Sequence, residues 1–88
     1  MIDRIREFAK KERIEFTHHA RAQMYARKIN SADVKQCLLD GEIIEEYRDD
    51  KPYPSFLLYA ELDQKYIHVV CAVAEEQLFI ITTYLIMV

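Results

Sequence analysis

The first residues of the chain have the apolar spacing of a helix. Ile2, Ile5, Phe8 and Ala9 recur at intervals of three and four among charged residues. This spacing predicts an amphipathic helix over residues 2–12, with one side facing a core.

A second helix is predicted after a short break. Residues 13–16 form the break, and an extended conformation is one option for them. Thr17 is a good N-cap, so the helix is expected over residues 18–28.

A third helix precedes the only glycine of the chain. Ser31 can cap it, and Asp33 in its first turn suits the helix dipole. Gly41 stands where a residue with positive φ commonly ends a helix. The core face of this helix is predicted to consist of Val34, Cys37 and Leu38.

The pattern then changes to that of β-strands. Four strands are predicted over residues 43–48, 55–62, 65–73 and 77–86. The connections are short, so the strands should form an antiparallel meander. The predicted fold is therefore α+β, with two to three N-terminal helices packed on a four-stranded antiparallel sheet. A chain of 88 residues is expected to form a single domain, residues 1–88.

The last two predicted strands are apolar at almost every position. A strand that is exposed on one face should alternate, so both sheet faces are expected to be covered. The helices can cover one face, which leaves the other for a second copy, a partner protein or a ligand. The chain also ends on apolar residues 85–88. We therefore predict a homodimer or an obligate partner.

The charge of the chain is unevenly distributed. The net charge is −3, but residues 1–28 hold eight Lys and Arg against four Asp and Glu, a net +4, which leaves −7 for the remainder. The basic helices could place positive potential on one side of the molecule. The alternative is a set of ordinary solvated helix faces.

Several classes of protein are excluded or disfavoured. Cys37 and Cys71 form no CxxC pair and fit no zinc spacing, so we expect two reduced core thiols. No cofactor or metal site is predicted, because phosphate-loop, HExxH, nucleophile-elbow and EF-hand motifs are absent. No apolar run approaches the roughly 20 residues that span a bilayer. The N-terminal residues do not form a secretory signal, so the expected location is cytoplasmic.

Three histidines are candidates for proton transfer near neutral pH. His18 and His19 begin the second predicted helix, where backbone N–H groups can hold a phosphate. Arg27 lies about 80° around the helix from His19, so both can border one cleft. His68 lies in the third predicted strand. The alternative to a role in proton transfer is that His68 is a buried, hydrogen-bonded core histidine.

This set suits metal-independent RNA cleavage. The 2′-hydroxyl attacks the adjacent phosphate, so one proton is taken and another is given. Arg or Lys can stabilise the charge on the phosphoryl oxygens.

Polar and aromatic side chains of the predicted sheet add further candidates. Thr82 and Tyr84 form a polar cluster at the end of the fourth strand. A two-residue turn at 75–76 would place His68 opposite Thr83 and point Thr82 to the other face, and a slip of one residue would reverse this. Tyrosines of this half can stack on RNA bases or pack with their hydroxyls at the rim. They are Tyr47, Tyr53, Tyr59, Tyr66 and Tyr84.

Several short motifs, in order, resemble domain-of-unknown-function family 4258, a small prokaryotic family. The likeness covers roughly Glu15 to Tyr84. The motifs are Phe16-Thr17-His18-His19-Ala20, Met24, Arg27, Asp33-Val34, Gly41-Glu42-Ile43-Ile44-Glu45, Tyr47, Asp50, Pro52-Tyr53-Pro54-Ser55, His68-Val69-Val70, Ala72-Val73 and Thr82-Thr83-Tyr84.

The resemblance implies kinship with the RelE/barnase-like group of small ribonuclease folds. Some members of that group are toxins paired with an antitoxin. The site residues that the resemblance implies are His19, Arg27, His68, Thr82 and Tyr84.

The sequence therefore predicts a metal-independent, toxin-like ribonuclease that acts on RNA. His19 and His68 are the acid and base candidates, and Arg27 is the phosphate stabiliser. The alternative is a non-catalytic interaction domain that dimerises or binds a partner, such as an antitoxin-like protein, through its apolar sheet.

Overall fold

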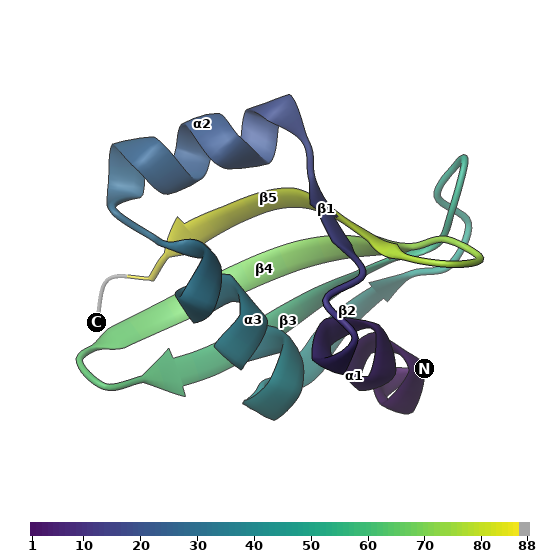
Figure 1. Cartoon of the computed structure of the whole chain (residues 1–88), viewed down its shortest axis with the longest axis horizontal. Coiled ribbons are helices and arrows are strands. Elements are labelled where there is room, and N and C mark those ends of the chain that lie inside the picture. Colours follow the sequence, from purple (N-terminus) through teal and green to yellow (C-terminus); the bar gives the residue numbers. More distant parts are fainter. Residues whose placement is uncertain (87–88) are drawn as a thin grey trace.

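Three helices and five strands make up the structure, a computed structural model that describes residues 1–86 (Figure 1). In chain order they are α1 (Ile2–Lys10), β1 (Ile14–Phe16), α2 (His18–Arg27), α3 (Ser31–Asp40), β2 (Glu42–Tyr47), β3 (Ser55–Leu62), β4 (Lys65–Val73) and β5 (Leu78–Leu85).

The five strands form one mixed sheet in the order β1-β5-β4-β3-β2. The α+β class is confirmed, and β2 to β5 form the expected antiparallel meander. The four-stranded, wholly antiparallel sheet is wrong, because β1 pairs in parallel with β5 at the sheet edge. Three residues are too few to give a readable strand pattern, and the partner of β1 lies more than sixty positions away in sequence.

The helices leave one face of the sheet free. In Figure 1, α1 and α3 pack on one side of the sheet and α2 runs along β5. Fully buried residues on the helix side include Ile5, Leu38, Phe56 and Ile67. We call the other side the open face. Its side chains include Glu45, Tyr47, Ser55, Leu57, Tyr59, Glu61, Tyr66, His68, Val70, Ala72, Phe79, Ile81, Thr82 and Tyr84.

Helix N-termini follow the predicted chemistry at one position and depart from it at another. Thr17 is the N-cap of α2, as predicted, and its Oγ1 accepts a hydrogen bond from Ala20 N–H at 3.1 Å. The N-cap of α3 is Asn30 rather than Ser31. Asn30 and Asp33 each accept a hydrogen bond from the other's backbone N–H, at 2.8 and 3.1 Å. This reciprocal box satisfies two helix donors, which one serine cap would not.

Glycine is required at position 41 because a side chain would not fit there, and not because of its backbone conformation. The predicted positive φ is wrong, because Gly41 has φ −76° and ψ 178°. A Cβ at this position would lie 2.5 Å from the carbonyl oxygen of Cys37 and 2.7 Å from that of Tyr59. The absence of a side chain therefore lets the end of α3 approach β3 closely.

A β-bulge in β2 changes which side chains face the open side. Ile43 pairs with Leu58 and Glu45 pairs with Leu57, so Ile44 is the extra residue. In a regular strand with no bulge at Ile44, Glu45 would lie on the core side together with Ile43, since alternate residues of a strand point the same way.

A second bulge lies in β5. Val70 pairs with Thr82 and Cys71 pairs with Ile80, which makes Ile81 the extra residue. The predicted turn at 75–76 is confirmed by its flanking pair, Val73 and Leu78. Beyond the bulge the register shifts by one residue.

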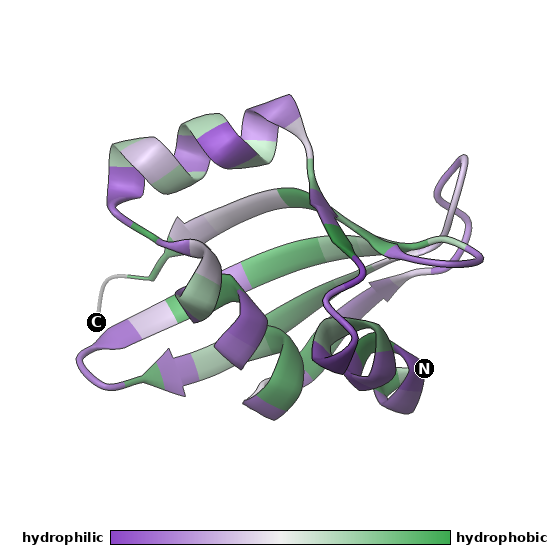
Figure 2. Ribbon diagram, in the orientation of Figure 1, coloured by the Kyte–Doolittle hydropathy of each residue, from purple (hydrophilic) through white to green (hydrophobic). Residues whose placement is uncertain are grey.

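Part of the open face is covered by the chain itself. Leu57 is 5% exposed and Ala72 is 7% exposed, although no helix packs on them. The loop between β2 and β3 folds over this region, and its Tyr53 ring stacks on Phe79 with 6.2 Å between centroids. Figure 2 shows the hydrophobic residues along the middle of the sheet strands. The apolar strands that suggested a partner are thus buried in part within one chain.

The C-terminal apolar residues continue this packing as far as they are described. Leu85 packs against the core, and Ile86 N–H donates to the Tyr66 carbonyl oxygen at 2.8 Å. Met87 and Val88, which belong to the predicted apolar tail, lie outside the described residues.

Both cysteines are buried free thiols, as predicted. Burial raises the pKa of Cys37 and of Cys71 to about 12 each. Neither thiol is therefore suited to act as a nucleophile, because the thiolate is the reactive form.

Replacing Gly41 with Ala should destabilise the protein by about 1–3 kcal/mol, because the added methyl group must displace backbone carbonyls. Urea unfolding of both proteins measures the difference. Glu42→Ala, at an exposed neighbouring position, is the control and should change stability by about 0.5 kcal/mol at most. Equal stability of Gly41→Ala and the wild type would contradict the close approach of α3 to β3.

Candidate functional site

His68 is the centre of an aromatic cluster on the open face. Its ring meets the Tyr84 ring edge-on, with centroids 5.0 Å apart and an angle of 76°. On the other side it meets Tyr59 in the same manner, at 5.9 Å and 79°. Tyr59 in turn stacks on Tyr66 at 6.4 Å. The four rings form a row across β3, β4 and β5.

The imidazole of His68 is held in its neutral form. The residue is half-buried, and its Nδ1 atom is buried without a hydrogen-bond partner. Burial lowers the pKa of His68 below its ordinary value of 6.5, and the negative charge of Glu45 opposes this shift. The alternative of a hydrogen-bonded core histidine is wrong. A neutral imidazole can accept a proton on its unprotonated nitrogen.

Glu45 is a member of this cluster that the sequence did not single out. The Tyr47 hydroxyl donates to Glu45 Oε1 at 2.9 Å. This hydrogen bond raises the pKa of Tyr47, and the charges of Glu45, Tyr84 and Asp50 add to the effect. Glu45 and Glu46 are adjacent in the sequence, and adjacent residues of a strand point to opposite faces, so the pair does not indicate a joint site. The sequence marks Glu45 only by its place among the motifs that resemble the family.

Thr82 and Tyr84 share the open face with His68 because of the β5 bulge. Of the two registers that the sequence left open, the one shifted by a residue holds, since Tyr84 and not Thr83 lies opposite His68. Thr83 instead pairs with Val69, is fully buried, and donates from Oγ1 to the His68 carbonyl oxygen at 2.9 Å. Thr82 and Tyr84 therefore point to the opposite side from Thr83.

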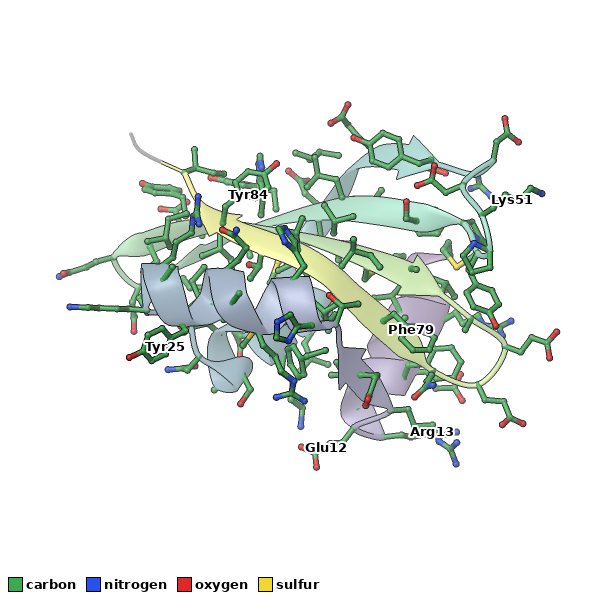
Figure 3. The ribbon with its side chains drawn as sticks, turned by 90° about the horizontal axis from the view of Figure 1, so that it is seen from above. Glu12, Arg13, Tyr25, Lys51, Phe79 and Tyr84 are labelled. Carbon is green, nitrogen blue, oxygen red and sulfur yellow. The ribbon has the colours of Figure 1, made fainter. Side chains whose placement is uncertain are left out.

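His19 and Arg27 are not brought into contact with His68. Both are exposed on α2, and Arg27 donates a hydrogen bond to Gln23. Figure 3 shows α2 running beside β5, with Tyr25 pointing away from the sheet. His19, Gln23 and Arg27 follow at intervals of four, each about 40° farther around the helix. Among residues 1–86, the hydrogen bonds and aromatic contacts do not join either residue to His68.

The basic residues of α1 serve the fold on the opposite side of the sheet. Arg4 Nη2 donates to the Ala74 and Glu75 carbonyl oxygens at 3.3 and 2.7 Å. Arg6 Nη2 donates to the Gly41 carbonyl oxygen at 2.5 Å. These two arginines therefore do not lie beside His68. Basic side chains of α2 lie along β5, and Arg13 lies at its start.

A pocket of about 320 Å³ opens on the same face, next to the aromatic cluster. Val70 and Ala72 of β4 line its floor. The loop between β2 and β3 contributes most of its wall, including Asp50 and Tyr53. The predicted strands leave this loop between them, and the sequence marked its Tyr53 as one of the tyrosines that can stack on RNA bases or pack with the hydroxyl at the rim.

Two further findings concern metal sites and membrane-spanning helices. Within residues 1–86, no three His, Cys, Asp or Glu side chains are grouped closely enough to hold a metal ion. The helices of this described part are too short and too polar to cross a membrane.

The lowered pKa of His68 predicts how stability depends on pH. The unfolded chain takes up a proton near pH 6.5, whereas folded His68 does so only at lower pH. The contribution of neutral His68 to the free energy of unfolding is thus fully present above pH 6.5 and is lost as the pH falls through the pKa of His68 in the folded protein. The wild type should lose more unfolding free energy than His68→Gln between pH 7.5 and 5.

Urea unfolding at several pH values measures this difference, with His18→Gln as an exposed control that should follow the wild type. Parallel curves for the wild type and His68→Gln would contradict the neutral, desolvated state of His68.

Comparison with known proteins identifies a family. Searches of curated proteins and of solved structures gave no match. The family model described as a domain of unknown function, DUF4258, matches residues 16–85, which include α2, the aromatic cluster and the pocket. The chain belongs to the DUF4258 family of domains of unknown function.

Proposed function

We propose that this protein is a metal-independent ribonuclease whose acid and base groups lie on the open face. The observation that carries the proposal is the contact between Tyr84 and the half-buried His68 on the open face, at 5.0 Å between ring centroids. A neutral histidine is the side chain best suited to take a proton from a hydroxyl near neutral pH.

Each group has a proposed role in one balanced step. The 2′-oxygen of RNA forms a bond to the adjacent phosphorus, and its proton passes to His68. The bond from phosphorus to the 5′-oxygen breaks, and the Tyr84 hydroxyl gives that oxygen a proton. Thr82 donates a hydrogen bond to a phosphoryl oxygen. The products are a 2′,3′-cyclic phosphate and a 5′-hydroxyl.

Residues of α2 are proposed to hold the RNA outside the reacting centre. His19 and Arg27 are exposed on a helix that runs beside β5 (Figure 3). An RNA strand that crosses β5 would meet them on one side and Tyr84 on the other. Their contribution is then to binding, through the phosphate backbone, rather than to proton transfer.

The wider proposal follows the family resemblance. We place the protein, as a single domain over residues 1–88, among relatives of the RelE/barnase-like ribonucleases of prokaryotes. It would act in the cytoplasm as a toxin held by an antitoxin-like protein. The exposed apolar side chains of the open face would bind that partner or a second copy of the chain.

A second candidate is a non-catalytic interaction domain. Glu45, Asp50 and Glu61 lie on or border the open face and oppose the approach of a polyanion. Tyr47 and Ile81 are 39% and 37% exposed on the same face. Such a mixture of acidic and apolar side chains favours a protein partner.

Cleavage of labelled RNA by the purified protein, alone and with ribosomes, tests the proposal. His68→Ala should reduce the cleavage rate by at least about 100-fold, which is the usual contribution of a general acid or base. Tyr84→Phe keeps the ring and removes only the hydroxyl, so it should also lower the rate. Arg27→Ala should weaken RNA binding more than the rate at saturation.

His18→Ala serves as the matched control, because His18 is also exposed on α2 and has no proposed role. It should cleave like the wild type. Cleavage by His68→Ala at the wild-type rate would remove His68 from the mechanism. Absence of cleavage by the wild type under both conditions would favour the interaction domain.

A further inference from the structure

The pocket on the open face is the place where exposed apolar side chains gather. Tyr47, Tyr53 and Ile81 line it, and they are 39%, 36% and 37% exposed. Exposed apolar groups that cluster around a concave surface mark binding sites more often than scattered ones do. Its volume of about 320 Å³ lies at the lower end of the range for small-molecule sites. One planar ring system is therefore a better match in size than a helix or a long peptide.

The charged side chains that line the pocket are Asp50, an acceptor of hydrogen bonds, and Lys51, a donor that can meet the phosphate of a nucleotide. The Ser55 hydroxyl donates a hydrogen bond to Asp50 Oδ2. Ser55 is only 4% exposed, so this bond holds the Asp50 carboxylate against the sheet. A carboxylate can accept about four hydrogen bonds, and Asp50 is exposed. It therefore keeps capacity for a ligand donor. The Tyr47 hydroxyl hydrogen is already given to Glu45.

The pocket adjoins the aromatic cluster. Val70 lines its floor and lies two residues from His68 on the same side of β4, a separation of roughly 7 Å. Tyr47 forms its rim and is hydrogen-bonded to Glu45, whose charge acts on His68. A base bound in the pocket would thus lie close enough to His68 for the phosphate of the same nucleotide to reach it.

We infer that this pocket binds a nucleobase that carries an exocyclic amino group, with Asp50 as the acceptor of its N–H hydrogens and with Tyr47 and Tyr53 as the aromatic border. Adenine, cytosine and guanine present an amino donor. Uracil presents two carbonyl oxygens beside its single N–H, and a carboxylate repels them. The inference rests on the proposed function, because it places the base of the RNA whose phosphate lies at His68.

Titration of the wild-type protein with CMP and with UMP, followed by amide NMR shifts, tests the inference. CMP should bind about tenfold more tightly than UMP, which is within the range of one good base contact. The largest shifts should fall on residues 47–55 and 70–72. Asp50→Asn keeps the size of the side chain but adds a donor, so it should abolish the preference for CMP.

Two further variants keep the test decisive. Asp63→Asn, in the exposed turn between β3 and β4, is the matched control and should retain the preference. Tyr53→Leu removes one aromatic face and should weaken both nucleotides by about fivefold or more, as loss of stacking on a base does. It gives an independent answer if Asp50→Asn fails to fold.

The outcomes separate this inference from the proposed function. Equal affinity for CMP and UMP, shifts confined to other surfaces, or no shifts with either nucleotide would overturn the base pocket, even if the protein cleaves RNA. A preference for CMP that Asp50→Asn removes would support the pocket, even if no cleavage is found. In that case the proposed catalysis would fail and base binding would stand.

Discussion

Two β-bulges decide which side chains share a face with His68. One extra residue in β2, Ile44, moves Glu45 and Tyr47 to the open face, and one in β5, Ile81, does the same for Thr82 and Tyr84. Strand side chains alternate strictly. Without the bulges these polar groups would therefore point into the core beneath the helices. The bulges thus permit apolar strands on one side and a polar, aromatic cluster on the other.

The bulged register is stabilised from the core side. Thr83 is fully buried, and its hydroxyl finds an acceptor in the His68 carbonyl oxygen at 2.9 Å. An unsatisfied buried hydroxyl costs about 1–3 kcal/mol, so this bond favours the shifted pairing. On the open side, the same register places the Tyr84 ring against the His68 ring, whose Nδ1 atom is buried without a hydrogen-bond partner.

Much of the fold could be read from the sequence, and the failures have physical causes. The bounds of β3 and β4 follow from their apolar residues and short turns, and Thr17 has the chemistry of an N-cap. The bulges were not readable, because Ile44 and Ile81 each follow another isoleucine, and two adjacent apolar residues do not show which of them faces the core. Gly41 was predicted to have a positive φ at the helix end, whereas its role is to leave room for the carbonyl oxygens of Cys37 and of Tyr59, the latter in a distant segment of the chain. Of the candidate site, the sequence named His68, Thr82 and Tyr84 but could not place them on one face, and it missed Glu45.

The β4–β5 register is the central claim, and cross-strand NOEs measure it most directly. In a uniformly labelled sample, we expect NOEs from the His68 ring to the Tyr84 ring and between the backbones of these two residues. We also expect NOEs from Thr83 to Val69 and not to the His68 ring. NOEs that pair the backbone of His68 with Thr83, together with Tyr84 protons among the core residues, would contradict the bulge and remove the basis of the site.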